Sequence, residues 1–324
     1  MPRYSVILGN LGNTCDRFLS AGYKDQPSKE IMIRQASEIE GVEGIELVGS
    51  WDIDEHNADQ IGDLLGKYNL SCVSIIPDLF SQKKWGTGSI ASKDPDIRAQ
   101  AMDYLFSICE ISRKIGCSLI NIWPGQDGYD YCLQANYLAE RQIIIENIKK
   151  LAFFYPDLRF SLEYKLKEPR THSFLARASD TLLVAMATEL PNVGVTIDTG
   201  HALFAYENMA ESAVMLDMSG KKLFHLHFND NYRYWDDDMI VGSVHLVEYV
   251  ELLYWLKKIG YNGWYSMDQY PYREDGKHAI EESVKFIQAI ERKLTPSAMK
   301  EIDNLLAEGK AVESQKWFRE FIFS

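Results

Sequence analysis

Residues 192–228 read NVGVTIDTGHALFAYENMAESAVMLDMSGKKLFHLHF, and this segment begins and ends with a short run of apolar and β-branched residues. The two runs, 192–198 and 222–228, start 30 residues apart, which is enough for a strand, a crossover helix and two loops. Polar side chains stand at the ends of both runs, Asp198 in the first and His227 in the second. The segment therefore predicts two neighbouring parallel strands joined by a crossover.

The same spacing recurs along the chain. Further strand-like runs at 3–9, 43–49, 70–76, 118–123, 158–164 and 263–269 bring the count to eight. Between the runs lie helical patterns at 30–40, 58–68, 96–114, 138–154, 179–189, 244–258 and 277–292. Because eight such units close on themselves, the sequence predicts an α/β fold, a single (β/α)8 TIM barrel forming the catalytic domain over residues 1–294.

Residues 295–324 lie beyond the eighth unit. They begin with a Thr-Pro pair, a helix-initiation signal, and contain two helical patterns, so we expect a C-terminal helical tail. An apolar cluster in the tail needs a surface that buries it, and it consists of Trp317, Phe318, Phe321, Ile322 and Phe323. This surface could belong to the chain's own barrel or to another subunit. We favour burial against another subunit, and hence a homo-oligomer.

Composition and charge exclude several classes of protein. The 324 residues are 46% hydrophobic and 25% charged, as in a folded soluble domain. A net charge of −13 without a local basic run argues against a nucleic-acid partner. The absence of a signal peptide or an 18-residue apolar stretch argues against a membrane partner and favours a cytoplasmic protein. The five cysteines lack CxxC spacing, which argues against a disulfide framework or a thiolate metal site.

Acids and histidines gather at the carboxyl ends of four successive predicted strands, where TIM barrels place their active sites. The fifth strand ends with Glu163 and Lys165, which alternation directs to the same side. The following strands contribute the other members of this set, namely Asp198, His201, His227, Asp236, Asp238 and Asp268.

The charge of this set indicates bound cations. At about 4 Å and an effective dielectric of about 20, each pair of like charges costs on the order of 4 kcal/mol. Two divalent ions together with Lys165 would balance the five carboxylates. Oxygen-rich ligation with one or two imidazoles suits Mn²⁺, Co²⁺ or Mg²⁺. The sequence thus predicts a divalent metal cofactor of two ions.

Each residue also has a simpler interpretation. A lone Asp at a strand end is more often a helix N-cap than a ligand. His225 is expected to be a packed barrel histidine, and Asp237 a solvated or paired acid. Trp85 belongs either to an apolar wall of the site or to a loop anchor. Acids and histidines follow one another on consecutive strands, and this order favours a shared set of metal ligands over these separate roles.

With these residues in view, the chain resembles the xylose-isomerase-like barrel superfamily, especially the two-metal isomerases for xylose and L-rhamnose. The fifth-strand segment 163–169, EYKLKEP, is similar to EPKPxEP of xylose isomerases. The seventh-strand segment looks like the family's FHxDxN motif followed by DxD and a glycine. The matching residues are Phe224-His225, Asn229, Asp236–Asp238 and Gly242. Two loops are similar as well, through Leu79-Phe80, Gly88-Ser89-Ile90 and Asp94 in the first and Trp123–Tyr129 in the second.

The resemblance implies a ligand set. Glu163, Asp198, His227 and Asp268 would hold the first metal, with Asp198 bridging to the second. The second metal would take His201, Asp236 and Asp238. His227 stands where xylose isomerases have a carboxylate, whereas rhamnose isomerases and ketose epimerases use histidine. A counterpart of the ring-opening histidine is absent after the second strand, where residues 48–51 read VGSW.

The resemblance further implies interconversion of an aldose and a ketose, by a metal-assisted hydride shift on an unphosphorylated sugar. Lys165 would stabilise the carbonyl oxygen, and Asp236 or Asp238 would orient a proton-accepting water. The expected catalytic residues are Lys165, Glu163, Asp268 and Asp236. The sugar would contact an apolar wall and two polar groups, from Trp123, Trp85, Phe80, His201 and Lys165.

Three other activities fit the same barrel. A ketose 3-epimerase uses one metal and two opposed carboxylates, but typically has Glu where this chain has Asp268 and lacks the Asp-x-Asp of a second metal. A sugar-binding protein without catalysis would be expected to lose a ligand or the lysine. A metal-dependent phosphodiesterase of the endonuclease kind is disfavoured by the net charge of −13.

Overall fold

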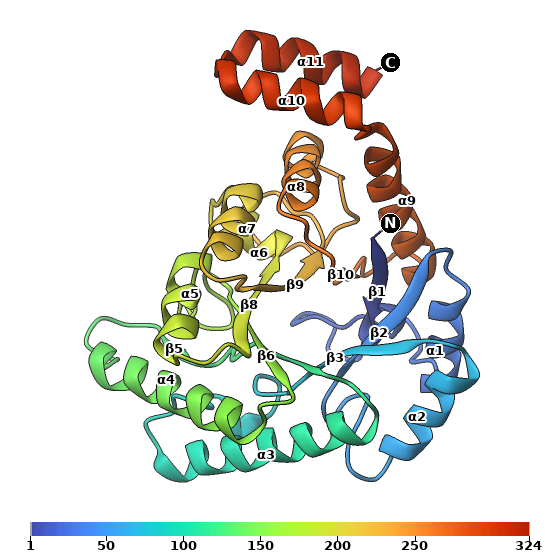
Figure 1. Cartoon of the computed structure of the whole chain (residues 1–324). Helices are drawn as coiled ribbons and strands as arrows, with labels where there is room; N and C mark the ends of the chain where they lie inside the picture. The colour runs from blue at the N-terminus through green and yellow to red at the C-terminus, as the bar shows by residue number, and fades with distance from the viewer. Residues whose placement is uncertain (1, 324) are drawn as a thin grey trace.

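Residues 2–323 are described by a computed structural model, in which eight parallel strands close into a barrel with helices outside it (Figure 1). The order around the barrel is β1-β10-β9-β8-β6-β4-β3-β2. The strands are β1 (Arg3–Ile7), β2 (Val42–Val48), β3 (Ser71–Ile76), β4 (Leu119–Ile122), β6 (Arg159–Glu163), β8 (Val193–Asp198), β9 (Leu223–Phe228) and β10 (Trp264–Met267). The (β/α)8 prediction is confirmed. Seven predicted runs contain one of these strands in full, and the run 43–49 overlaps β2, which starts one residue earlier.

Strand register positions the polar residues at one rim. In the β8–β9 ladder Asp198 lies opposite His227, and in the β6–β8 ladder Glu163 lies opposite Thr196. Because all eight strands are parallel, their carboxyl ends open on the same face. A two-stranded antiparallel sheet of β5 (Gly128–Tyr129) and β7 (His172–Ser173) joins two loops that follow β4 and β6.

Helices occupy the predicted crossovers. They are α1 (Lys29–Ser37), α2 (Ala58–Lys67), α3 (Pro95–Lys114), α4 (Tyr137–Phe154), α5 (Ala178–Ala187), α8 (Leu246–Lys258) and α9 (Gly276–Lys293). Two helices in the β8–β9 crossover were not predicted, α6 (Thr199–Phe204) and α7 (Met209–Met218). All of α6 is buried and the apolar residues of α7 are spread around its axis, so neither shows the one-sided stripe of a surface helix.

The C-terminal tail forms two helices, α10 (Pro296–Glu308) and α11 (Ala311–Phe323), which project beyond α8 and α9 (Figure 1). The Thr295 side chain caps α10 by accepting a hydrogen bond from the Ala298 amide, with proline in the first turn. Trp317 stacks on Phe321 at 4.6 Å and donates from Nε1 to Glu301 of α10 at 3.0 Å. Trp317, Phe318 and Phe321 are also partly buried against the main hydrophobic core. The chain itself thus covers part of this apolar cluster, and the predicted contact between subunits stays a prediction.

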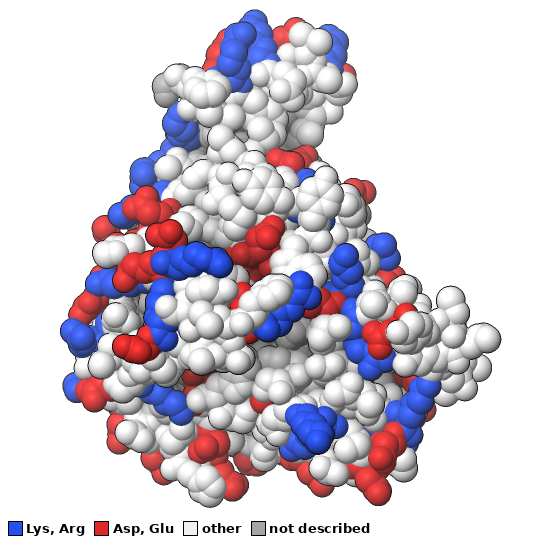
Figure 2. Space-filling view, turned by 180° about the vertical axis from the view of Figure 1, so that it is seen from behind, with Lys and Arg blue, Asp and Glu red and all other residues white. Residues whose placement is uncertain are grey.

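The surface carries charges of both signs. Figure 2 shows acidic and basic side chains interspersed over one face, which is hollowed near its middle. Within residues 2–323 the structure has no helix that is long and apolar enough to span a bilayer.

Candidate active site

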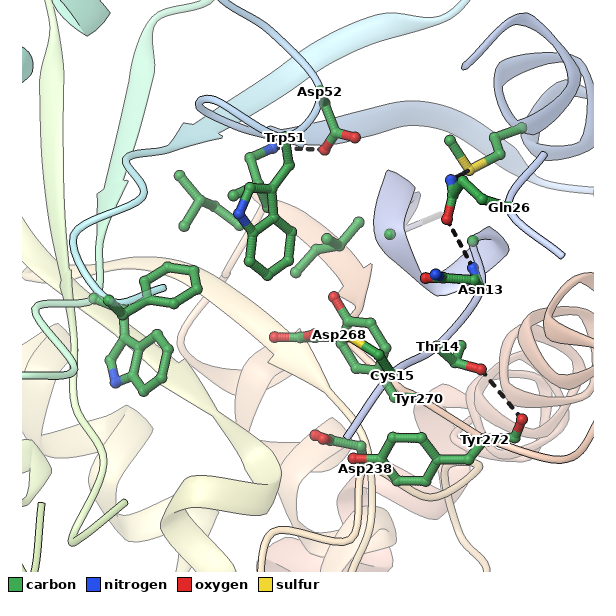
Figure 3. A pocket seen from close by; sticks show the side chains of 18 of the residues that line it. Asn13, Thr14, Cys15, Gln26, Trp51, Asp52, Asp238, Asp268, Tyr270 and Tyr272 are labelled. Atoms are coloured by element: carbon green, nitrogen blue, oxygen red, sulfur yellow. Dashed lines mark hydrogen bonds between the residues drawn. The ribbon is translucent and has the colours of Figure 1, made fainter. Parts of the chain in front are cut away.

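A cavity of about 830 Å³ opens at the carboxyl ends of the strands. Glu163, Lys165, His201, Asp236 and Asp268 line one part of it. Cys15 lines the same cavity as Asp238, Asp268 and Tyr270 (Figure 3), so the cavity also borders the loop that follows β1. The cavity therefore joins the predicted polar rim to a loop from the other end of the chain.

Glu163, Asp198, His227 and Asp268 form the first cluster of candidate ligands. One donor atom from each side chain lies within 4.8 Å of the others. His227 Nδ1 is 3.4 Å from Glu163 Oε2 and 3.3 Å from Asp268 Oδ2. Asn121 holds Glu163 in place by donating from Nδ2 to Oε2 at 2.7 Å. The four residues predicted for a first metal thus lie together.

The second cluster consists of Asp198, His201 and Asp236, with the same limit of 4.8 Å between donor atoms. His201 Nε2 lies 3.1 Å from Asp236 Oδ2, and its Nδ1 lies 3.3 Å from Glu163 Oε1. Asp198 belongs to both clusters. The structure therefore brings two sets of ligands side by side with one carboxylate in common.

Asp198 is also a helix N-cap. Its Oδ1 accepts a hydrogen bond from the His201 amide at 2.8 Å, and its Oδ2 accepts one from Asn229 Nδ2 at 2.8 Å. Each carboxylate oxygen has a second lone pair, so capping leaves room for an ion. Gly200 allows this turn, since a Cβ there would collide with Oδ1 of Asn229. The capping and ligand interpretations of Asp198 are thus compatible.

Lys165 places a buried cation beside the second cluster. Its Nζ lies 2.8 Å from Asp236 Oδ2 and 2.8 Å from Glu168 Oε2. Burial opposes the charged form, but the Asp236 and Glu168 carboxylates outweigh it and raise the pKa of Lys165. Nζ also lies 5.2 Å from the centre of the Trp123 ring, within the range of a cation–π contact. Lys165 therefore carries a positive charge into the cavity.

Opposed pKa shifts show how tightly the acids are packed. Burial opposes ionisation of Glu163, but the adjacent His227 and His201 lower its pKa. Burial raises the pKa of Asp198 to about 7, and neighbouring Asp268 and Asp236 add to that rise, while His201 opposes it. Such shifts arise when several carboxylates share a small volume, and a divalent cation would relieve them.

The donor atoms fit divalent ions. His201 Nδ1, His227 Nδ1 and Asp236 Oδ1 are buried and have no hydrogen-bond partner among residues 2–323. Buried polar atoms are normally paired, so three unpaired ones within the two clusters indicate a missing partner. The carboxylates and imidazoles of the set suit Mn²⁺, Co²⁺ or Mg²⁺ better than a soft ion.

The predicted ligand Asp238 lies outside the two clusters, as do Asp237 and His225, which were not predicted to be ligands. Asp238 lines the cavity but lies outside both clusters, which among residues 2–323 leaves the second set with Asp198, His201 and Asp236. Asp237 points away into its loop, where it accepts a hydrogen bond from the Tyr232 amide at 3.0 Å. His225 is buried and bonds Glu46, as a packed barrel histidine would.

Aromatic side chains cover one side of the cavity. Phe80 lies 4.7 Å from Trp123 and 5.5 Å from Trp51, measured between ring centres, and all three line the cavity. Trp85 is fully buried, donates from Nε1 to the Asp78 carbonyl oxygen at 2.9 Å and is absent from the cavity lining. The predicted wall thus consists of Phe80 and Trp123 with Trp51, while Trp85 anchors its loop.

Sequence reasoning missed two parts of the site. The loop after β1 contributes Asn13, Thr14 and Cys15 to the cavity lining (Figure 3). Their signal was polar residues that follow the first predicted strand, the same signal that marks the rim residues of the later strands. Glu46 lies inside the barrel and bonds both histidines of β9. An acid within the apolar run EGIELVG was its signal.

Among curated proteins, the chain is similar to a xylose isomerase of Thermus thermophilus, with 25% identity over 67% of this chain and 57% of that protein. A probable sugar isomerase of Rhizobium meliloti is 30% identical over 48% of this chain and 36% of that protein. The chain therefore spans only about a third to just over half of the length of these relatives.

Solved structures with the same fold include two ketose 3-epimerases. D-psicose 3-epimerase of Clostridium cellulolyticum H10 superimposes with a TM-score of 0.69 at 15% identity, over 89% of this chain and 99% of that one. D-allulose 3-epimerase of Methylomonas sp. gives a TM-score of 0.69 at 19% identity, over 89% and 96%. A family model matches residues 33–290, and with the barrel and its rim in place the chain belongs to the xylose isomerase-like TIM barrel family.

Proposed function

We propose that this protein is a divalent-metal-dependent sugar isomerase that interconverts an aldose and a ketose. The observation that carries the proposal is the pair of ligand clusters that share Asp198, with the Lys165 cation next to the second cluster. Two adjacent ions and a fixed positive charge suit a reaction in which charge develops on two neighbouring oxygens. The similarity to xylose isomerases supports the same reaction class.

The chemistry divides between the cofactor and the chain. Bound ions would act as Lewis acids on adjacent oxygens of the open-chain sugar and favour hydride transfer between carbons 1 and 2. Lys165 would stabilise the negative charge that develops on the carbonyl oxygen. Asp236 would orient the group that accepts the hydroxyl proton, and Phe80 and Trp123 would exclude water from the reacting carbons.

An assay with free sugars tests the proposal. Protein stripped with chelator and reloaded with Mn²⁺, Co²⁺ or Mg²⁺ is incubated with a panel of unphosphorylated aldoses and ketoses. We expect conversion of at least one aldose–ketose pair by the loaded protein and none by the stripped protein. Sugar binding without turnover at any metal concentration would contradict isomerisation and support a non-catalytic binding barrel.

A ketose 3-epimerase is the second candidate. A solved epimerase matches 89% of this chain, and the Glu163 and Asp268 carboxylates both lie within 3.4 Å of His227 Nδ1. Epimerisation removes a proton from carbon 3, whereas a hydride shift retains the transferred hydrogen. Reaction in deuterated water distinguishes them. We expect little deuterium at carbons 1 and 2 and none at carbon 3, while full exchange at carbon 3 would establish the epimerase.

A further inference from the structure

A buried carboxylate inside the barrel contacts the candidate metal ligand His227, at the ring nitrogen that faces away from the first cluster. Glu46 lies on β2 and His227 on β9, strands that are not neighbours, so their contact crosses the barrel interior. Glu46 Oε1 lies 2.7 Å from His225 Nε2, and Oε2 lies 3.3 Å from His227 Nε2. The relative exposures are 0% for Glu46 and His227 and 1% for His225, which leaves little room for water between them.

The contacts of Glu46 suit an ionised carboxylate, which can only accept hydrogen bonds. The Ser74 hydroxyl also donates to Oε2, so three donors converge on two oxygens. The rings of His225 and His227 are nearly perpendicular, with their centres 5.0 Å apart, and each directs Nε2 at the acid. In this arrangement both imidazoles carry their proton on Nε2.

The other nitrogen of His227 faces the candidate metal cluster. With the proton on Nε2, Nδ1 retains its lone pair between Glu163 Oε2 and Asp268 Oδ2, at 3.4 and 3.3 Å. It has no hydrogen-bond partner among residues 2–323. A histidine that ligates a metal needs this lone pair, and a partner on its other nitrogen fixes both the tautomer and the ring orientation.

We propose that Glu46 is a positioning residue that holds His227 in the Nε2-protonated tautomer and thereby presents Nδ1 to a divalent ion. The inference rests on the proposed metal-dependent function and extends it to a residue outside the ligand set. His225 is the second imidazole that Glu46 contacts. Glu46 is absent from the cavity lining, and it contacts His227 at Nε2, not at Nδ1. With His225 and His227 it forms a third group of side chains that could hold an ion.

The test combines metal affinity with the tautomeric state of His227. In Glu46→Gln protein the amide nitrogen replaces one acceptor, so one imidazole loses its partner and His227 can place its proton on Nδ1. We expect the affinity for Mn²⁺, measured by titration calorimetry, to fall about 10- to 100-fold. Ser74→Ala is the matched control, since it removes one donor but neither imidazole contact, and its affinity should stay near that of the wild type.

Nitrogen-15 NMR of the histidine side chains supplies the second readout. It is recorded on the metal-free protein at a pH high enough that His227 is neutral, because burial opposes the charged form but Glu163 and Glu46 outweigh it and raise the pKa of His227. We expect the proton of His227 on Nε2 in the wild type and a shift toward Nδ1 in Glu46→Gln. A proton on Nδ1 of wild-type His227 overturns the proposal without any variant, as does unchanged Mn²⁺ affinity in Glu46→Gln protein. The proposal is also overturned if Glu46→Gln protein binds one Mn²⁺ ion fewer per chain than the wild type, since Glu46 would then be a metal ligand. Wild-type protein that binds no divalent ion would instead refute the proposed function.

Discussion

Lys165 shows how one side chain can serve both stability and chemistry. It neutralises Asp236 and Glu168 while its ammonium group faces the cavity beside Trp123. If Lys165 were only structural, a variant that still folds would keep its activity. If Lys165 is catalytic, a folded variant loses activity, because a preorganised cation stabilises mainly the transition state.

Lys165→Met should lower kcat of the loaded enzyme by about 100- to 1000-fold, with little change in the number of Mn²⁺ ions bound. Steady-state kinetics and metal analysis of the purified variant measure both quantities. Lys167→Met is the matched control, because Lys167 lies two residues on, is partly exposed and contacts only the Phe204 ring among the aromatics. Equal activity of the two variants would contradict the role of Lys165.

Asp52 predicts a pH-dependent contribution to stability. Burial raises its pKa from 3.8 to about 6, against a hydrogen bond from the Val48 amide to Oδ2 at 2.8 Å. Since the folded pKa exceeds the unfolded one, the folded state binds the proton more tightly, and Asp52 costs stability as pH rises from about 4 to about 6. Two pKa units correspond to about 3 kcal/mol above that range.

Asp52→Asn removes this titration and keeps an oxygen that can accept from Val48. The variant should therefore gain in melting temperature over the wild type at pH 7.5 and lose most of that gain at pH 4.5. Thermal melts at several pH values measure the difference. A gain that does not vary with pH would show that Asp52 does not titrate in this way.

At the scale of elements, Asp127 joins the loops after β3 and β4. Its Oδ1 accepts from the amides of Ser89 and Ala91, at 2.8 and 3.0 Å. Its Oδ2 accepts from the Ser89 hydroxyl and the Ile90 amide, at 2.6 and 3.1 Å. Asp127 is buried, and its four hydrogen bonds hold the loop after β3, which carries Phe80, against the loop after β4.

Asp127→Asn should free residues 88–92, because the amide nitrogen cannot accept the hydrogen bonds now made to one oxygen. We expect a loss of about 1–3 kcal/mol and faster amide exchange confined to this loop, measured by hydrogen–deuterium exchange. Asp130→Asn on the same loop affects the pairing with Arg170 and the contacts with the amide and hydroxyl of Thr171, and it should leave residues 88–92 protected. Equal protection of both variants would refute the anchoring role.

The elements differ in how well the sequence revealed them. Strands and amphipathic helices such as α3 have one-dimensional patterns, and these predicted the barrel. Helices α6 and α7 have no polar face, so their pattern resembles that of any buried segment. The rim residues were predicted because each follows a strand. An acid within the apolar run EGIELVG marked Glu46 as unusual, but its contact with His227 across the barrel is contained in no local pattern. The burial of Trp85 likewise depends on how its loop folds back.

For the whole molecule, the tail makes a prediction about assembly. The side chain of Phe323 is 84% exposed and that of Leu306 is 49% exposed, on α11 and α10, which extend beyond α8 and α9 (Figure 1). We expect the wild type to be oligomeric and the double variant Leu306→Ser with Phe323→Ser to shift toward monomer, as measured by light scattering after gel filtration. Phe153→Ser, which removes an exposed phenylalanine from α4, is the control and should not change the mass. A monomeric wild type would contradict the prediction.

The double role of Asp198 affects any attempt to redesign this centre. Its two oxygens fix where α6 begins and hold Asn229, and α6 in turn carries His201. Substituting this aspartate would shift the next imidazole along with the charge it removes, so single replacements cannot separate coordination from backbone geometry. An engineer who wants a different ion here would have to move strand end, turn and helix start as one unit.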